Sequence, residues 1–133
     1  MSVTPQQLLQ LASELHQAAA SEVQYRNVIG RAYYSCYHIA LDFHGQLSSP
    51  GRESPDSAGN HAKLAYRLQN PTIPSTDAKF RISRIVGMRL QAFHAIRVKA
   101  DYRTDVDISA NESRDAIIKA VGIRDVIIGK PSP

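Results

Sequence analysis

Three helix-start signals of one kind occur along this chain, and they limit its possible folds more than any other feature. In a capping box, the side chains of a Ser or Thr and of a Glu or Gln three residues later bond each other's backbone N–H. The pattern occurs at residues 4–7, 21–24 and 109–112, and Pro5 also stands at the first helical position of the first of these. We therefore expect helices from Thr4 to about Ala20, from Ser21 to about His44, and from Ser109 to Gly129 and Pro131.

Two further segments have the apolar spacing of helices, and no segment has the sustained alternation of a strand. Residues 61–68 have this spacing, and Pro71 closes the segment. A longer segment starts at a cap, Ser75 or Thr76, and has apolar residues at Phe80, Ile82, Ile85, Val86, Leu90, Phe93 and Ile96. Residues 46–60 are rich in Ser, Pro and Gly and predict a mobile loop. The predicted fold is an all-α bundle of four to five helices.

The length and the composition fit one such domain. We expect the domain to cover residues 1–133, with a frayed tail at 130–133, and the 43% of hydrophobic residues can supply its core. The formal net charge is +4 and the pI about 9.4, which is compatible with a polyanionic partner but does not identify one. No run of like charges forms a dedicated basic tail.

The single cysteine and the first ten residues indicate in which cellular compartment the protein works. One cysteine excludes an internal disulfide and a cysteine-rich metal site. Because Cys36 lies in an apolar, aromatic segment, we expect a buried, inert thiol rather than a nucleophile. Residues 1–10 lack the features of a signal peptide, and no apolar run approaches membrane-spanning length. We therefore expect a cytoplasmic protein with no membrane partner.

The second predicted helix carries polar side chains that solubility alone would not select. One stripe, expected in the core, holds Ile29, Tyr33, Cys36, Ala40 and Phe43, and another holds Asn27, Arg31, Ser35, His38 and Asp42. Residues seven apart differ by only about 20° in direction, so Arg31 and His38 should point the same way. The polar row fits a ligand site. Alternatively, Arg31 pairs with a carboxylate inside the bundle and a backbone carbonyl satisfies His38.

The long fourth segment holds a second Arg–His pair and a polar end. Arg89 and His94 are five residues apart, which means about 140° of rotation, so their side chains should diverge. His94 and Arg97 should share a face. The charges of Arg97, Lys99 and Arg103 are compatible with an anion site. The alternative is a solvated helix end, where Arg97 and Lys99 interact favourably with the helix dipole.

Neither a metal nor a tightly bound cofactor is expected. His61, at the start of the short segment, is interpreted as a surface or capping residue. None of the five histidines has the spacing of a metal ligand. The seven glycines are scattered, so they form no phosphate-binding loop.

Three sequence blocks resemble the motifs of HEPN domains, which are helical domains associated with nucleotide and RNA chemistry. Residues 31–40, Arg-Ala-Tyr-Tyr-Ser-Cys-Tyr-His-Ile-Ala, resemble the family signature Arg-Ala-Tyr-Tyr-x-x-Phe/Tyr-His-x-Ala. Gly59-Asn60-His61 resembles the short Ser/Asn-His segment that follows, and residues 97–102 resemble the Arg-x-x-Ala-Asp-Tyr block ahead of the last helix. The order and spacing of the blocks agree with the family, and the resemblance covers about residues 5–128.

The resemblance implies an up-and-down bundle that commonly forms a homodimer, with polar residues of both copies facing a shared groove. Many HEPN proteins are toxins or defence effectors that cut RNA without a metal, through an Arg-x(4–6)-His motif. Others are non-catalytic and bind nucleotides or partner a nucleotidyltransferase. The implied partners are therefore RNA or a nucleotide, a second copy of the chain, and an antitoxin or nucleotidyltransferase.

The catalytic motif of the family normally lies at the turn into the last helix, and this chain departs from it. Tyr102 stands where a His is expected after Arg97. Two other pairs fit the spacing, Arg89 with His94 and Arg31 with His38. The first pair follows residues 85–88, which resemble the run ahead of the motif in toxin members, but it lacks the family's neighbouring Asn and Tyr. The residues expected to bind RNA or a nucleotide are Tyr34, Arg97, Lys99, Asp101, Tyr102 and Arg103.

The sequence is compatible with three functions. The leading hypothesis is a HEPN-type toxin or defence component that cuts RNA without a metal. A His would act as general acid or base, and an Arg would bind the phosphate. Because Arg89 and His94 diverge, such a site would take Arg89 from one chain and His94 from its two-fold mate. The second is a non-catalytic module that binds a nucleotide or a partner protein through Arg31, His38, Arg97 and Tyr102. The third is a purely structural interaction protein.

Overall fold

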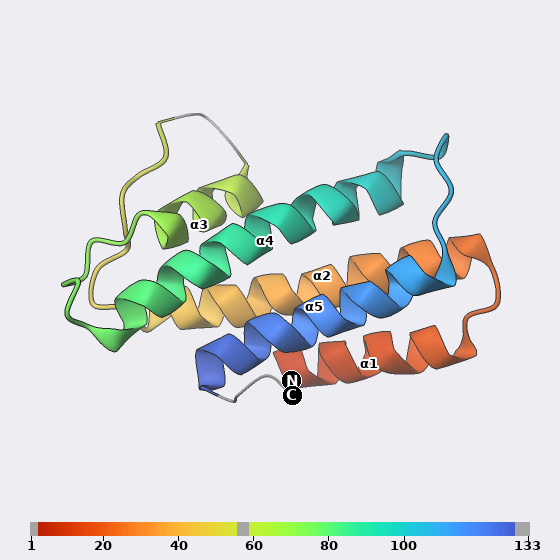
Figure 1. Ribbon diagram of the computed structural model, residues 1–133, viewed down its shortest axis with the longest axis horizontal. Coiled ribbons are helices and arrows are strands. Elements are labelled where there is room, and N and C mark those ends of the chain that lie inside the picture. Colours follow the sequence, from red (N-terminus) through yellow and green to blue (C-terminus); the bar gives the residue numbers. More distant parts are fainter. Residues whose placement is uncertain (1–2, 56–58, 130–133) are drawn as a thin grey trace.

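Five helices make up the protein: α1 (Pro5–Ala18), α2 (Glu22–Gly45), α3 (Asn60–Gln69), α4 (Ala78–Tyr102) and α5 (Ala110–Ile128) (Figure 1). The computed structural model describes residues 3–55 and 59–129, and these ranges contain no strand. The predicted all-α bundle is therefore confirmed. The predicted frayed tail, 130–133, lies outside the described residues, as do residues 56–58 of the predicted loop.

The three predicted capping boxes form, and they begin α1, α2 and α5. The expected cap of α4 was wrong. The carboxylate of Asp77 caps this helix by accepting from the Lys79 N–H at 2.9 Å. Ser75 and Thr76 instead belong to a turn, which the Asp77 N–H closes on the Pro74 carbonyl at 2.9 Å. At the far end, α5 stops as predicted at Gly129, whose left-handed backbone (φ 77°) suits a residue without a Cβ.

The helix α2 is the centre of the bundle and packs against α1, α4 and α5. Figure 1 shows α1, α2 and α5 running side by side, with α4 beside them and the short α3 along the first half of α4. The helix α3 packs mainly on α4 and has few contacts with α2. Consequently α2, α3 and α4 meet along one side of the molecule, away from α1.

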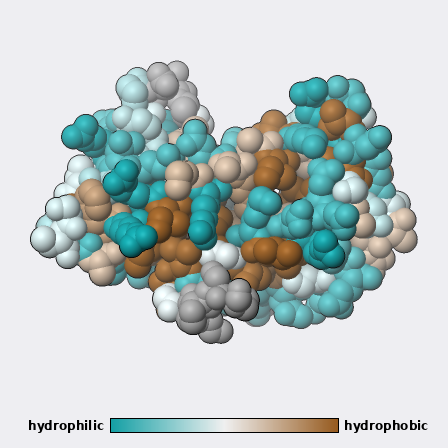
Figure 2. All heavy atoms as spheres, in the orientation of Figure 1, coloured by the Kyte–Doolittle hydropathy of each residue, from teal (hydrophilic) through white to brown (hydrophobic). Residues whose placement is uncertain are grey.

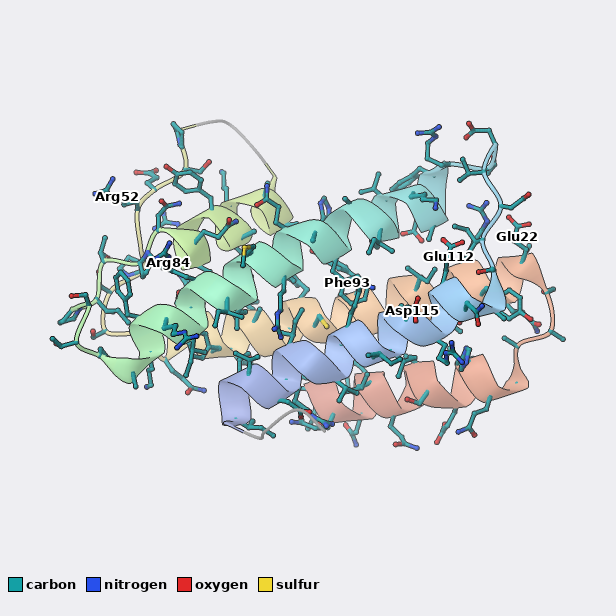
Figure 3. All side chains as sticks on the ribbon, in the orientation of Figure 1. Glu22, Arg52, Arg84, Phe93, Glu112 and Asp115 are labelled. Carbon is teal, nitrogen blue, oxygen red and sulfur yellow. The ribbon has the colours of Figure 1, made fainter. Side chains whose placement is uncertain are left out.

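The predicted core stripe of α2 is confirmed, because all five of its side chains are buried. Figure 3 shows Phe93 pointing from α4 toward α2, where its ring meets that of Tyr33 edge-on at 5.5 Å. Cys36 is buried, as expected, and burial raises the pKa of its thiol, which disfavours the reactive thiolate. Ser35 was wrongly assigned to the polar stripe. It is buried, and its hydroxyl donates to the Ala32 carbonyl at 2.8 Å.

The surface combines apolar patches with hydrophilic surroundings. Figure 2 shows apolar residues along the middle of one face, with hydrophilic residues around them and at both ends. Met88 on α4 and Ile118 on α5 are among the exposed apolar side chains. Among the described residues, none of the helices is both long enough and apolar enough to cross a membrane.

Candidate functional site

Three of the five histidines gather where α2, α3 and α4 meet. The rings of His61, in the first turn of α3, and His94, on α4, are stacked with their centroids 5.2 Å apart and their planes at 14°. Tyr37 of α2 lies against His61 at 4.3 Å and against His38 at 5.4 Å. The three histidines are far apart in the sequence, and the packing of α3 on α4 and of α4 on α2 brings them together.

The other two histidines have structural partners elsewhere. His16 of α1 bonds the Ser113 hydroxyl of α5 at 2.8 Å. His44, at the end of α2, bonds the Pro50 carbonyl at 2.8 Å and so holds the start of the following loop. The two therefore stabilise the fold and lie outside the histidine group.

His61 is the residue that the sequence interpretation underestimated. Gly59 occupies the capping position of α3, and the His61 side chain is half-buried. Its Nδ1 lies 2.8 Å from the Tyr33 hydroxyl, which fixes the ring and leaves Nε2 for another partner. The signal that pointed to His61 was its place in the block Gly59-Asn60-His61, and not any property of the short helix itself.

Tyr33 belongs to the core and to the site at once. Its side chain is only 2% exposed, and its ring packs against those of Phe93 and His94. Burial raises the pKa of its hydroxyl, so the phenol stays protonated and serves as a hydrogen-bonding group for His61. The apolar stripe of α2 therefore predicted its burial but not this polar contact.

Arg97 lies beside the histidines and is oriented by a carboxylate. Its Nε pairs with Asp101 at 2.7 Å, one turn further along α4. Its guanidinium carbon lies 6.0 Å from the ring centroid of Tyr33 and 5.8 Å from that of Tyr102. An arginine has five N–H donors, so one carboxylate does not use them all. A Cβ on Gly30 would lie 3.3 Å from Asp101 Oδ1, so the bare backbone of Gly30 gives this carboxylate its room.

Burial and positive neighbours keep the two stacked imidazoles neutral. The pKa of His61 is lowered, first by burial and then by the charges of His94, Arg97 and His38. The pKa of His94 is lowered by burial and by Arg97. A neutral imidazole has one unprotonated nitrogen, so each ring can accept a proton near pH 7.

Two pockets adjoin the stacked histidines. The first, here called the arginine pocket, is lined by Asn27, Arg31, Tyr34, His61, Arg97 and Asp101 among others and measures about 310 Å³. The second, called the amide pocket, lies between α3 and α4, measures about 540 Å³ and includes Tyr66, Gln69, Gln91 and His94 in its lining. His61 lines both pockets, so it forms a wall between them.

Several residues predicted from the sequence meet in the arginine pocket. Arg31, Tyr34, Arg97 and Asp101 all line it, and the ring of His38 lies edge-on to Tyr34 at 4.4 Å. Arg31 is exposed in this pocket, so it has no place inside the bundle, where the alternative interpretation put it. Tyr102 is exposed beside Arg97.

Three other predicted residues do not join this group. Arg89 and His94 diverge, as the helical geometry predicts. Arg89 lines a different pocket, between α4 and α5, together with Ile118 and Gly122. Lys99 pairs with Glu112 of α5 at 3.2 Å, and Arg103 pairs with Asp105 at 3.0 Å. The charges of Arg97, Lys99 and Arg103 therefore do not converge on one anion site within a single chain.

The functional groups at this site are imidazoles, guanidinium groups and tyrosine rings. Within residues 3–55 and 59–129, no group of three or more His, Cys, Asp or Glu side chains is placed to hold a metal ion. Neutral imidazoles can transfer protons, and arginine side chains can bind an anion through several N–H donors. Tyrosine and imidazole rings offer flat faces to an aromatic ligand.

Comparison with known proteins identified no relative of this chain. Scans of protein-family models, of curated proteins and of solved structures found no significant match to this chain. The resemblance to HEPN domains therefore stays a prediction from the three sequence blocks.

Proposed function

We propose that this chain is a HEPN-type protein that binds RNA where α2, α3 and α4 meet and cleaves it without a metal, as a toxin or defence component. The observation that carries the proposal is the stacked, neutral pair His61–His94 beside Arg97 and the exposed Arg31. Proton transfer at a phosphate needs a neutral base, a group that can give up a proton, and cations for the developing charge. All three kinds of group adjoin here.

In the proposed reaction, His94 takes the proton from a ribose 2′-OH, and the oxygen attacks the adjacent phosphorus. The bond between phosphorus and the 5′-oxygen breaks, which leaves a 2′,3′-cyclic phosphate. The 5′-oxygen receives a proton from His61. A bound phosphate favours the charged form of a neighbouring imidazole, so RNA itself would raise the pKa of His61 and charge it for this step.

The two arginines would hold the phosphate. Arg97 pairs with Asp101 through Nε, and its guanidinium has further N–H groups that could donate to phosphate oxygens. Arg31, on α2, lines the same pocket as Arg97. Charge-assisted bonds from two arginines would stabilise the negative charge that develops on the phosphate in the transition state.

A specific observation favours a second candidate, a non-catalytic module that binds a nucleotide. The Asp101 carboxylate in the arginine pocket neutralises part of the charge of Arg97, which weakens the stabilisation of extra negative charge. Tyr102 also stands where the family resemblance expects a histidine. A nucleotidyltransferase or an antitoxin as partner, and a homodimer, belong to both candidates.

Cleavage of a mixed-sequence RNA in the presence of EDTA tests the proposal. We expect the wild-type chain to produce 2′,3′-cyclic phosphate ends. Loss of His94 or Arg97 in the alanine variants should slow the reaction by about 10²-fold or more. Arg114→Ala, which removes an exposed arginine of α5, is the matched control and should cleave normally. Circular dichroism of each variant checks that it is folded.

The other outcomes separate the alternatives. If the wild type leaves RNA intact at high concentration but binds a labelled nucleotide, the non-catalytic module is correct. If Arg89→Ala is inactive, and an equal mixture with His94→Ala regains activity, the site is shared between two chains. In that case the arrangement within one chain is wrong. If His38→Ala alone abolishes cleavage, His38 rather than His94 is the essential histidine.

A further inference from the structure

We infer that the amide pocket is a nucleobase pocket, in which the Gln69–Gln91 pair holds the edge of the base next to the phosphate. This inference rests on the proposed function, because it takes the arginine pocket as the phosphate site. It adds the part of the substrate that the chain recognises. The argument uses the hydrogen bonds of the two glutamines, the rings that line the pocket, and the wall that it shares with the arginine pocket.

The hydrogen bonds of Gln69 determine which way both amides point. Gln69 Nε2 donates to the Ala65 carbonyl at 3.1 Å and to Gln91 Oε1 at 2.8 Å. A carbonyl only accepts, so nitrogen and not oxygen of Gln69 must face Ala65. The second hydrogen of this nitrogen then requires the oxygen of Gln91. The orientation of the pair follows from its partners.

This arrangement leaves one acceptor and one donor group for a ligand. Both N–H bonds of the Gln69 amide are used, so its Oε1 remains as an acceptor. Gln91 has accepted through its oxygen, and its NH₂ group has no partner among the described residues. Nucleobase edges present neighbouring donors and acceptors, and an amide is a common protein partner for such an edge. Neither glutamine adds a charge, which suits a neutral ring.

Flat rings line the same pocket. The imidazoles of His61 and His94 and the ring of Tyr66 belong to its walls, together with the small side chains of Ala62, Ala65 and Ala95. Rings of this kind stack on nucleobases, and each stacked base contributes about 1–3 kcal/mol to binding. A volume of about 540 Å³ lies in the usual range for small-molecule sites, about 300–1,000 Å³. The pocket is therefore large enough for one base.

The amide pocket adjoins the arginine pocket, which is the proposed phosphate site. Because His61 lines both pockets, a group in one lies next to a group in the other. Within one nucleotide, the base and the phosphate are likewise close together, because both are attached to the same ribose. A nucleotide can thus place its phosphate against Arg97 and its base against Gln91, with His61 between them.

Isothermal titration calorimetry with AMP, CMP, GMP, UMP and ribose 5-phosphate tests this inference. We expect at least one nucleotide to bind about tenfold or more tightly than ribose 5-phosphate. Gln91→Ala should remove this advantage and leave the affinity for ribose 5-phosphate unchanged. Gln91→Glu replaces the donor by an acceptor and should change the ranking of the four bases. Gln17→Ala, an exposed glutamine on α1, is the matched control, since α1 contacts neither α3 nor α4.

The results distinguish failure of this inference from failure of the proposed function. Equal affinities for ribose 5-phosphate and all four nucleotides, lowered together by Arg97→Ala, overturn the base pocket and retain the phosphate site. A preference among bases that survives Gln91→Ala also overturns the base pocket. If none of the five compounds binds, the phosphate site and the base pocket are both wrong. If Arg97→Ala has no effect on any of them but Gln91→Ala removes the preference among bases, the phosphate site is wrong and the base pocket is retained.

Discussion

At the scale of single residues, the close packing of His61 and His94 has an electrostatic cost. Two imidazoles stacked at 5.2 Å beside Arg97 cannot both be charged without repulsion. Burial adds to this effect, and the Tyr33 hydroxyl holds one ring in place. The folded protein therefore keeps these rings neutral at a pH where the unfolded chain would begin to protonate them.

This difference predicts a pH dependence of stability. The ordinary histidine pKa is 6.5, and the folded protein lowers it for both rings. The unfolded state then binds more protons below about pH 6.5, so their contribution to stability is complete above this pH and is lost as the pH falls. We expect the double variant His61→Gln, His94→Gln to lose less unfolding free energy than the wild type between pH 7.5 and pH 5, measured by urea unfolding. Parallel pH profiles would show that the two imidazoles are not perturbed.

At the scale of helices, the site depends on how closely α3 approaches α4. A Cβ on Gly87 would lie 2.8 Å from the backbone nitrogen of Gln69 and from Leu68 Cβ, and 2.9 Å from the Ala65 carbonyl. The missing side chain therefore lets the two helices touch. Nearby, the buried Ser83 hydroxyl donates to the Leu68 carbonyl at 2.7 Å and satisfies the end of α3. These contacts hold the helix that carries His61.

Gly87→Ala should separate α3 from α4. Alanine is the better helix former by up to about 1 kcal/mol, but its methyl group would meet fixed backbone atoms. We expect a net loss of about 1–2 kcal/mol in unfolding free energy, and faster amide hydrogen exchange in α3 than in α1. Gly45→Ala is the control, because a Cβ there meets nothing within 4 Å. Unchanged exchange in α3 would contradict the close approach.

At the scale of the whole molecule, Arg26 connects distant parts of the bundle. Its guanidinium pairs with Glu22 at 2.8 Å and donates to the carbonyls of Ala100 and Arg103 at 3.0 Å each, and to that of Val106. It thereby joins the start of α2 to the end of α4 and to the turn before α5. Figure 3 shows Glu22 and Glu112 at this same end of the bundle. Arg97 and Asp101 lie in the last turns of α4, so this connection also supports the site.

Arg26→Ala should therefore cost more than the loss of an ordinary surface arginine. The substitution leaves the carbonyls of Ala100, Arg103 and Val106 without this donor, which we expect to cost about 2 kcal/mol. Arg26→Lys should restore only part of this loss, because an ammonium cannot reach the same set of acceptors. Urea unfolding followed by circular dichroism measures both, with Arg114→Ala as the control expected within about 0.5 kcal/mol of the wild type. Equal costs for Arg26→Ala and Arg114→Ala would disprove the connecting role.

The sequence by itself determined the features that depend on neighbours a few residues apart. Capping boxes such as that of Ser109 are local hydrogen bonds, and the core stripe of α2 follows from the helical repeat alone. The divergence of Arg89 and His94 follows from the same repeat. Two local features were missed. Ser35 is buried although it lies on the polar stripe, and the cap of α4 is Asp77 because a turn at Pro74 decided among three adjacent polar residues.

Only the tertiary structure decided which polar groups meet. The stacking of His61 on His94, the hydroxyl of Tyr33 at His61 and the amide pair Gln69–Gln91 all join residues of different helices. Their meeting depends on the distance and angle at which α3 packs on α4, and these depend on contacts such as that at Gly87. A helical pattern specifies the direction of each side chain around its own axis. It does not specify which helix that side chain will face.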